Sequence, residues 1–183
     1  MKRIAIMGCS GSGKSTLARA LGQELGLPVH HLDSYYWLPG WMEPDRDEFR
    51  ETLEGLYARD EWVIDGGYVG MDTNDVKFKR ADLFVVFDRP VWLSIWRVLK
   101  RRLKYRNRTR PDMGPDCPEK VDLEFLMFIW NYRRDHWPRV QSRLAQYGVR
   151  VITLESDPYV PELAAKIRAL SASAQTSPAN PEA

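Results

Sequence analysis

The chain of 183 residues has the length of one domain, or of one domain with an inserted lobe. Hydrophobic residues make up 44% and charged residues 28%, as in ordinary globular proteins, and a formal net charge of +2 gives no global sign of nucleic-acid binding. The most apolar segment is shorter than a membrane span and is broken at residues 88–90, which excludes a membrane-spanning protein. Two cysteines and the lack of a signal-peptide pattern favour reduced thiols and a cytoplasmic location.

The predicted elements alternate between strands and helices along the chain. Apolar and β-branched runs predict strands at 3–7, 29–32, 62–65, 83–88 and 149–154. Helical periodicity predicts helices at 14–26, at 45–60, from Pro90 onward, over about 119–147 with a break near Pro138, and at 158–170. This alternation predicts an α/β fold, with a parallel sheet covered by helices on both faces. The long connection between the fourth and fifth strands predicts a lid lobe at approximately 97–137, and residues 171–183 are expected to be a disordered tail.

The sequence GCSGSGKS at residues 8–15 matches the pattern G-x-x-x-x-G-K-[ST], with a strand before it and a helix after it. Glycines allow positive φ, so that successive backbone N–H groups can point inward and bind phosphate at the start of a helix. In this interpretation Lys14 reaches the β- and γ-phosphates of ATP, and Ser15 binds Mg²⁺. The predicted nucleotide-binding residues are Gly8, Cys9, Ser10, Gly11, Ser12, Gly13, Lys14, Ser15 and Thr16.

Two carboxylates follow predicted strands. Asp65 ends the strand WVID, and a magnesium–phosphate site needs a carboxylate at such a position, so we favour a metal role over a turn-capping role. Asp33 follows the second strand and could bind the phosphate acceptor, act as its base, or cap a turn. The aromatic loop at 35–41 comes next, and it could stack a ring of the acceptor or fill a gap between helices.

Eight basic residues and no acid occupy residues 97–110. On a helix, Trp92, Ile95, Trp96, Leu99 and Leu103 form one apolar stripe, which predicts that the aromatic side packs inward and the guanidinium groups point outward. Three interpretations compete: a solvated basic face, a set of arginines that closes on the phosphates, and a nucleic-acid patch. We favour the phosphate-binding set, with Arg97 and Arg101 on this helix and Arg133 on a facing one.

Several motifs together resemble the P-loop proteins known as DNA topology modulation (FlaR-like) proteins, which are related to adenylate kinases. They are GCSGSGKSTLARAL, HLDSYYWLPGW, WVIDGGY, WRVLKRRLKYRNRTRPDM and CPEKVDLEFLMFIWNY. The resemblance covers about residues 1–170. It implies the P-loop NTPase three-layer fold, a five-stranded parallel sheet in the order 2-3-1-4-5, an arginine-rich helical lid, ATP as donor, and an adenine site near Ser156–Pro158. Adenylate kinases carry an Arg in the turn after their third strand that contacts the acceptor's phosphate. Here the turn reads Gly66-Gly67-Tyr68-Val69, which argues against AMP as the acceptor.

These observations lead to an ATP-dependent phosphotransferase with ATP and Mg²⁺ as cofactors and an unidentified small-molecule or nucleotide acceptor. The expected catalytic residues are Lys14, Asp33, Asp65, Arg97, Arg101 and Arg133, and the expected metal ligands are Ser15 and Asp65. The alternatives are a nucleic-acid-associated ATPase or switch that uses the basic helix, and an NTP-binding protein without catalysis. No membrane partner is expected, and the sequence leaves the oligomeric state open.

Overall fold

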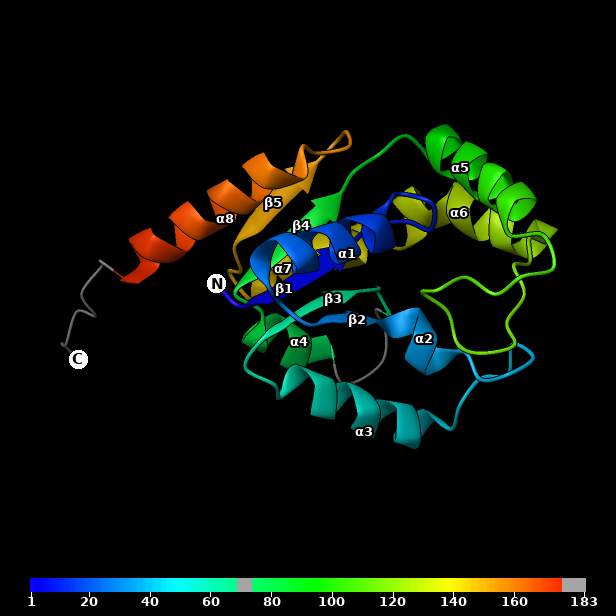
Figure 1. Ribbon diagram of the computed structural model, residues 1–183, viewed down its shortest axis with the longest axis horizontal. Coiled ribbons are helices and arrows are strands. Elements are labelled where there is room, and N and C mark those ends of the chain that lie inside the picture. The colour runs from blue at the N-terminus through cyan, green and yellow to red at the C-terminus, as the bar shows by residue number, and fades with distance from the viewer. Residues whose placement is uncertain (69–73, 176–183) are drawn as a thin grey trace.

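A computed structural model describes residues 1–68 and 74–175 and contains a five-stranded parallel sheet (Figure 1). The strands are β1 (Arg3–Met7), β2 (Val29–His31), β3 (Trp62–Asp65), β4 (Leu83–Phe87) and β5 (Val151–Leu154). Their order in the sheet is β2-β3-β1-β4-β5, and every neighbouring pair is parallel. The α/β fold predicted from the sequence pattern and the strand order implied by the family resemblance are therefore confirmed.

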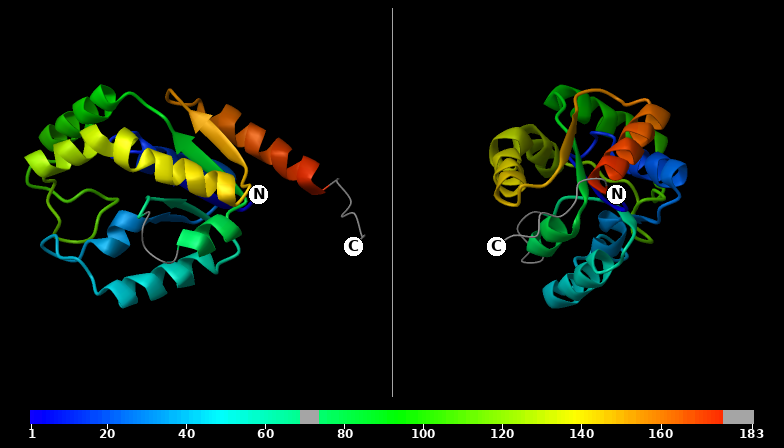
Figure 2. Two further views of the ribbon diagram at one scale, coloured as in Figure 1. Left: turned by 180° about the vertical axis from the view of Figure 1, so that it is seen from behind. Right: turned by 90° about the vertical axis from the view of Figure 1, so that its left-hand side faces the viewer.

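Helices cover both faces of the sheet. Helices α1 (Lys14–Leu25) and α8 (Val160–Gln175) pack against one face, where Ile4, Ile6, Val63 and Val85 are fully buried. Helices α3 (Arg46–Tyr57), α4 (Asn74–Arg80) and α7 (Trp137–Gln146) pack against the other face (Figure 2). Because successive side chains of a strand point to opposite faces, each inner strand supplies both cores and reads as a continuous apolar run.

Local signals set the helix boundaries. Gly13 and Gly26 flank α1 with φ of 103° and 69°, values that favour glycine. Asp45 caps α3 by accepting hydrogen bonds from the backbone N–H groups of Asp47 and Glu48. The predicted break near Pro138 is confirmed, because α6 (Leu123–Asp135) ends and α7 begins on either side of His136, with Pro138 in the first turn of α7.

Beyond the carboxyl ends of the strands lie helix α5 (Val91–Lys104), the start of α6 and the loop that joins them (Figure 1). We call this connection, residues 105–122, the lid loop. It runs back toward α2 (Leu32–Tyr36), which follows β2. In open parallel sheets, ligands bind at this end of the strands, so the lid loop and α2 border the expected binding region.

Helix α5 buries a different side from the one that the sequence predicted. Ser94 and Val98 are buried against the glycine loop and α6, whereas Trp92 and Leu103 are 67% and 78% exposed. Trp96 and Leu99 are exposed as well, and Ile95 alone of the stripe packs against the buried Val98 and Ile129, so the prediction that the whole apolar stripe packs inward is wrong. The helix packs through small and medium side chains because the glycine loop approaches it closely: a Cβ on Gly11 would lie 2.4 Å from the carbonyl oxygen of Ser94.

Other differences concern short elements and one helix end. Helices α2 and α4 were not predicted. Helix α8 runs to Gln175, so residues 171–175, which the sequence placed in the tail, are helical, while 176–183 lie outside the described residues. Within residues 1–68 and 74–175, no helix combines the length and the apolar character needed to cross a bilayer.

Candidate nucleotide and acceptor site

The glycine loop, residues 8–15, connects β1 to α1 and has the backbone geometry of an anion-binding loop. Gly8, Gly11 and Gly13 have φ of 147°, 80° and 103°. Any side chain on Gly8 or Gly11 would also clash, because Phe87 and Ser94 approach within 3.1 Å of the Cβ positions. Lys14 Nζ donates a hydrogen bond to the carbonyl oxygen of Cys9 at 2.8 Å. The lysine is thus folded over the loop, where phosphate oxygens would bind.

Ser15, which follows Lys14, forms a hydrogen bond with Asp65 at the end of β3. The Ser15 hydroxyl donates a hydrogen bond to Asp65 Oδ2 at 2.7 Å, and His31 Nδ1 contacts Oδ1 of the same carboxylate. Asp65 is 4% exposed. A hydroxyl and a carboxylate beside a phosphate-binding loop are oxygen ligands suited to Mg²⁺. The described residues hold no group of three His, Cys, Asp or Glu side chains that could bind a metal by themselves, so a magnesium ion here would also need phosphate oxygens.

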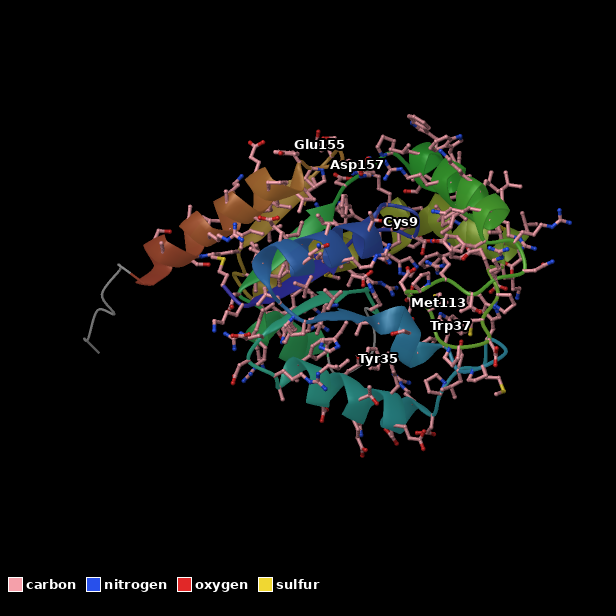
Figure 3. The ribbon with its side chains drawn as sticks, in the orientation of Figure 1. Cys9, Tyr35, Trp37, Met113, Glu155 and Asp157 are labelled. Atoms are coloured by element: carbon pink, nitrogen blue, oxygen red, sulfur yellow. The ribbon has the colours of Figure 1, made fainter. Side chains whose placement is uncertain are left out.

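Two arginines and one carboxylate border the glycine loop near the end of β5. Asp157 pairs with Arg89 at 2.7 Å and with Arg97 at 2.7 Å, and Arg97 also donates to the carbonyl oxygen of Ser12 at 3.3 Å. Burial acts to raise the pKa of Asp157, but the hydrogen bonds and charges of the two arginines outweigh it and lower this pKa. In Figure 3, Asp157 lies on one side of Cys9, and Trp37 and Met113 lie on the other.

On the Trp37 side, Asp33 and Tyr68 face each other. The Tyr68 hydroxyl donates to Asp33 Oδ1 at 2.9 Å, and burial together with the Asp33 charge raises the pKa of Tyr68, which keeps the phenol protonated. Tyr68 has φ of 43°, which is uncommon for a residue with a side chain and is found at functional sites. Gly66 and Gly67, in the same turn, accept hydrogen bonds from the buried Lys77 Nζ at 2.7 and 3.4 Å.

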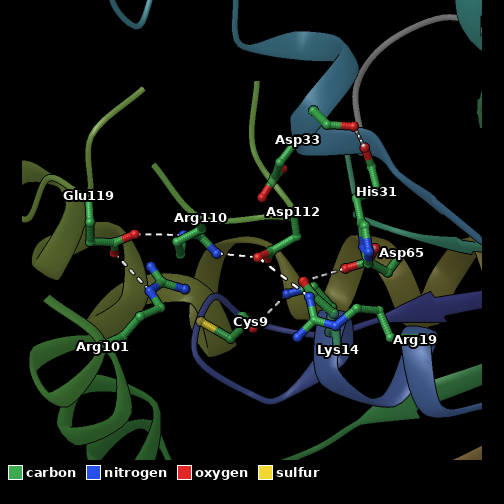
Figure 4. Close-up of polar contacts among 12 residues, drawn as sticks. Cys9, Lys14, Arg19, His31, Asp33, Asp65, Arg101, Arg110, Asp112 and Glu119 are labelled. Atoms are coloured by element: carbon green, nitrogen blue, oxygen red, sulfur yellow. Dashed lines mark hydrogen bonds and ion pairs between the residues drawn. The ribbon is translucent and has the colours of Figure 1, made fainter. Parts of the chain in front are cut away.

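A network of ion pairs joins the lid loop to α5 and α1 (Figure 4). Glu119, whose side chain is 1% exposed, contacts Arg101 at 2.8 Å and Arg110 at 2.6 Å. Arg110 contacts Asp112 at 2.8 Å, and Asp112 lies 3.6 Å from Arg19 on α1. Removing one partner of a buried pair costs about 3–5 kcal/mol, so the contacts of Glu119 with Arg101 and Arg110 hold the lid loop against α5.

The lid loop also contacts the segment after α2. Gly40 N donates to the carbonyl oxygen of Asp116 at 3.0 Å, and Trp41 Nε1 donates to that of Pro118 at 3.0 Å. Gly114 lies so close to Trp37 that a Cβ would come within 1.9 Å of the Trp37 carbonyl oxygen. Trp41 and Asp116 have φ of 64° and 50°, so both partners adopt uncommon backbone conformations at the contact. The lid loop therefore packs closely against residues 37–41, which follow α2.

These elements surround one cleft of about 1280 Å³. It is lined by the glycine loop, by Asp33, Trp37, Trp41 and Tyr68 on the acceptor side, by Arg97 and Asp157 on the other side, and by the lid loop between them. A cleft of this size has room for two small ligands.

The structure brings most of the predicted site residues together around this cleft. Lys14, Ser15, Asp33, Arg97 and Arg101 line it, and Asp65 contacts Ser15 below it. Gly8, Ser10, Gly11 and Gly13 of the glycine loop and Thr16 of α1 line the cleft as well. Arg101 is occupied by its contact with Glu119.

Three predicted residues lie elsewhere. The side chains of Cys9, Ser12 and Arg133 line a separate cavity of about 20 Å³ behind the glycine loop, which has room for roughly one water molecule. Arg133 contacts Asp88 at 3.5 Å and its side chain is 61% exposed. Val69, named with the turn after β3, lies outside the described residues.

Sequence reasoning missed Asp112 and Glu119 of the lid loop, Tyr68 and Lys77. A signal existed for the first two, since they are acids next to a basic helix and would be expected to pair with it. Lys77 carries no local signal, because it is one of several basic residues in the last turn of α4.

The chain is similar in sequence to two curated proteins. It is 35% identical to the uncharacterized protein YqaC of Bacillus subtilis, over 60% of this chain and 58% of that protein. It is 27% identical to the deoxyadenosine kinase of Dictyostelium discoideum, over 70% of this chain and 63% of that protein. The chain thus spans about three fifths of the length of these relatives. No family model matches it.

Solved structures of kinases share the fold. The shikimate kinase of Acinetobacter baumannii in complex with shikimate matches with a TM-score of 0.66 at 19% identity, covering 97% of this chain and 96% of that one. A gluconokinase of Sinorhizobium meliloti 1021 matches with a TM-score of 0.57 at 18% identity, covering 96% and 97%. The chain therefore has the fold of the P-loop kinases.

Proposed function

We propose that the protein is an ATP-dependent phosphotransferase that transfers the γ-phosphate of ATP to a hydroxyl group of a small molecule. The observation that carries this proposal is the position of one carboxylate. Asp33 lines the same cleft as Lys14 and Ser15, and the Tyr68 hydroxyl donates a hydrogen bond to one oxygen of the Asp33 carboxylate. A phosphate-binding loop facing a preorganised carboxylate is the arrangement that transfer to a hydroxyl requires.

The nucleotide is bound by the glycine loop. Its backbone N–H groups and Lys14 contact the phosphates, and Arg97 lies beside Gly13, within reach of the same anion. Ser15 and Asp65 would hold Mg²⁺, which would offset the charge of the phosphate oxygens. The narrower resemblance to DNA topology modulation proteins adds nothing to this chemistry and remains an expectation from the motifs.

The acceptor lies between Asp33 and the side chains of Trp37 and Trp41, which follow α2. The Tyr68 hydroxyl donates to Asp33 Oδ1, and within residues 1–68 and 74–175 no hydrogen bond reaches Oδ2, which can accept the proton of an acceptor hydroxyl. Trp37 and Trp41 line the cleft and provide flat apolar surfaces for a ring. Arg19 and Arg110 also line it, but both contact Asp112, so an acidic acceptor would have to compete with that carboxylate.

An uncharged hydroxyl compound with a ring therefore fits this side best. Nucleosides belong to this class, and the deoxyadenosine kinase relative is consistent with it. The exclusion of water by the closed lid loop favours transfer to the acceptor over hydrolysis.

The test measures ADP formation with magnesium and ATP against a panel of nucleosides, their 5′-monophosphates and hydroxylated metabolites. We expect activity with at least one uncharged compound, and Lys14→Ala should abolish it while leaving the melting temperature of the protein without ligands unchanged. An unaltered rate for Lys14→Ala would contradict the proposal. Nucleotide binding without ADP formation across the whole panel would instead favour a binding protein without catalysis.

A second candidate, a nucleic-acid-associated ATPase, is favoured by one observation. Lys100, Lys104, Arg106 and Arg108 are exposed on α5 and the start of the lid loop. Arg101 and Arg102, by contrast, contact Glu119, so the basic surface that is free to bind a backbone is smaller than the sequence suggested. Binding to single- or double-stranded DNA or RNA that weakens steeply with salt, and that is lost when the four exposed residues become alanine, would support this candidate.

A further inference from the structure

We propose that helix α5 docks on an anionic lipid surface through four exposed apolar side chains, while the basic residues beside them contact the lipid phosphates. The four side chains are Trp92, Trp96, Leu99 and Leu103, which we call the exposed row. The sequence predicts no membrane partner because its apolar segments are too short to span a bilayer, whereas a helix that lies on a bilayer needs no such length. The inference goes beyond the proposed function and does not depend on it.

The exposed row is left uncovered by the rest of the described chain. Its side chains are 67%, 53%, 46% and 78% exposed in chain order. Helix α5 packs on the glycine loop and on α6 through another side, which carries Val91, Ser94, Ile95 and Val98. No member of the exposed row lines the cleft, so neither a nucleotide nor an acceptor would cover it. Large apolar side chains gathered on one exposed helix face mark an interaction surface.

The exposed row has the shape of a ridge. Its members follow one another at intervals of four, three and four residues, so they form one continuous line along the 14-residue helix. Helix α5 lies at the end of the molecule opposite the free end of α8 (Figure 1). Because the two ends of the row, Trp92 and Leu103, are its most exposed members, the row protrudes and does not line a groove. A deformable bilayer takes up such a ridge, and tryptophan favours the boundary between headgroups and acyl chains.

The charges beside the exposed row are positive. Residues 89–111 contain no Asp or Glu. Lys100 and Lys104 are exposed on α5, and Arg106 and Arg108 are exposed just after it. The Lys100 Nζ lies 5.0 Å from the centre of the Trp96 ring, so an ammonium group and a member of the row share one face. Anionic headgroups complement this face, since basic residues near a negatively charged bilayer strengthen its binding.

The same charges argue against two other occupants. In a second copy of this chain that docked α5 on α5, the lysines of the two helices would repel each other. A nucleic-acid backbone would attract the basic residues, but it has no use for Leu99 and Leu103, because bases stack on rings and not on leucine. An anionic bilayer uses both the apolar and the basic part of the surface.

The first experiment measures binding to vesicles by flotation, without ATP. One set of vesicles contains phosphatidylglycerol and phosphatidylcholine in equal parts, and the other contains phosphatidylcholine alone. We expect the unmodified protein to bind the anionic vesicles about tenfold more tightly or better. Changing all four residues of the exposed row to alanine should weaken this binding by about tenfold or more. Tyr159→Ala is the matched control, because Tyr159 is 72% exposed and lies outside α5, and it should bind as the unmodified protein does.

Three outcomes of this experiment would overturn the inference. They are no binding of the unmodified protein to anionic vesicles, equal binding to the two sets of vesicles, and equal binding by the four-alanine variant and the unmodified protein. Because all four side chains are exposed, the four-alanine variant should melt close to the unmodified protein, which separates loss of docking from loss of folding.

The second experiment tests whether this face enters the bilayer. Brominated lipids quench tryptophans that come close to the acyl chains. The double variant Trp92→Phe with Trp96→Phe keeps two apolar rings, so it should bind the anionic vesicles nearly as well as the unmodified protein. Its quenching by brominated vesicles should be less than half as strong. Equal quenching of the two proteins would show that another surface enters the bilayer, which would overturn the inference.

The rival occupants are tested without vesicles. Light scattering that shows a dimer of the unmodified protein and a monomer of the four-alanine variant would assign the exposed row to a second copy and overturn the inference. Binding of DNA or RNA that the four-alanine variant loses would assign the row to nucleic acid, with the same result. A single mass for both proteins, together with nucleic-acid binding that is absent or unchanged, supports docking on lipid. Failure of the lipid experiments leaves the proposed function intact, because that function is tested by ADP formation.

Discussion

Arg97 and Asp157 form an ion pair of 2.7 Å that joins helix α5 to the loop after β5, directly beside the glycine loop. The same guanidinium donates to the carbonyl oxygen of Ser12. Of the three arginines that the sequence proposed as phosphate ligands, Arg97 thus lies against the nucleotide loop, Arg101 is held by Glu119, and Arg133 lies behind the loop.

This difference predicts unequal effects of two substitutions. Arg97→Ala should weaken the binding of an ATP analogue about tenfold or more, since a hydrogen bond to a charged group is worth roughly 1.5–3 kcal/mol. Arg133→Ala should change it less than about twofold, because its side chain is mostly exposed and pairs only with Asp88 among the ion pairs of the described residues. Isothermal titration calorimetry on both variants measures the two constants. Equal losses would contradict the placement of Arg97.

The contact between Gly114 and Trp37 predicts how closure can be disturbed. Gly114→Ala places a methyl group within 1.9 Å of the Trp37 carbonyl oxygen, so the lid loop must move away from the α2 segment. We expect KM for the acceptor to rise several-fold, and trypsin to cleave the lid loop faster. As a control, Gly55→Ala lies in α3 with no atom within 4 Å of the new Cβ and should stabilise the protein by roughly 0.5–1 kcal/mol. Unchanged acceptor KM and unchanged cleavage in Gly114→Ala would contradict the contact.

Much of the fold follows from patterns that are local in the sequence. The glycine loop between β1 and α1, and the buried run that ends at Asp65, are each complete within a few residues, and both lie where the sequence placed them. The cap at Asp45 is equally local. The parallel order of the strands follows from the alternation of elements together with the family resemblance.

What could not be predicted depends on contacts between distant segments. Asp112 lies 3.6 Å from Arg19 although 93 positions of the chain separate them, and no spacing rule connects the two residues. The prediction that the apolar stripe of α5 is buried was wrong for a related reason. Helical periodicity shows that one side is apolar, but which side packs was decided here by the close approach of Gly11 to Ser94. Tyr68 and Asp33 meet only because β2 and β3 are neighbours in the sheet.

Two substitutions in α5 test which side is buried. Val98 is fully buried and packs against Gly11, so Val98→Ala should lower the free energy of unfolding by about 1–3 kcal/mol. Leu103 is 78% exposed, and Leu103→Ala should change the free energy of unfolding by less than about 0.5 kcal/mol. Urea denaturation measures both values. A larger loss for Leu103→Ala would show that the exposed side is covered.

The lowered pKa of the buried Lys77 predicts that the stability of the protein depends on pH. Burial is the main cause that lowers its pKa, to about 7, with the Asp65 charge opposing the shift. Between about pH 7 and the ordinary value of 10.5, the unfolded chain therefore carries a proton on Lys77 that the folded protein lacks. Unfolding then takes up a proton, so this group makes stability rise with pH across that window, by at most about 1.4 kcal/mol per pH unit. Below pH 7 both states are protonated and the slope disappears.

The measurement compares the slope of the free energy of unfolding between pH 7.5 and 9.5 in three proteins. Lys77→Met should lose the positive contribution to the slope. Lys79→Met, an exposed lysine two positions along the same helix, should keep the slope of the unmodified protein. Identical slopes in all three would show that Lys77 titrates normally in the folded state.

The two cysteines are both buried, and each lies at a contact between two segments of the fold. Cys117 Sγ lies 3.2 Å from the carbonyl oxygen of Leu38, where the lid loop meets the α2 segment, and Cys9 Sγ lies 3.9 Å from that of Ile129 on α6. Burial raises the pKa of the Cys9 thiol to about 11, which further slows its alkylation. Thiol-modification rates therefore provide two native reporters: labelling of Cys117 follows separation of the lid loop, and labelling of Cys9 follows displacement of α6 from the nucleotide loop.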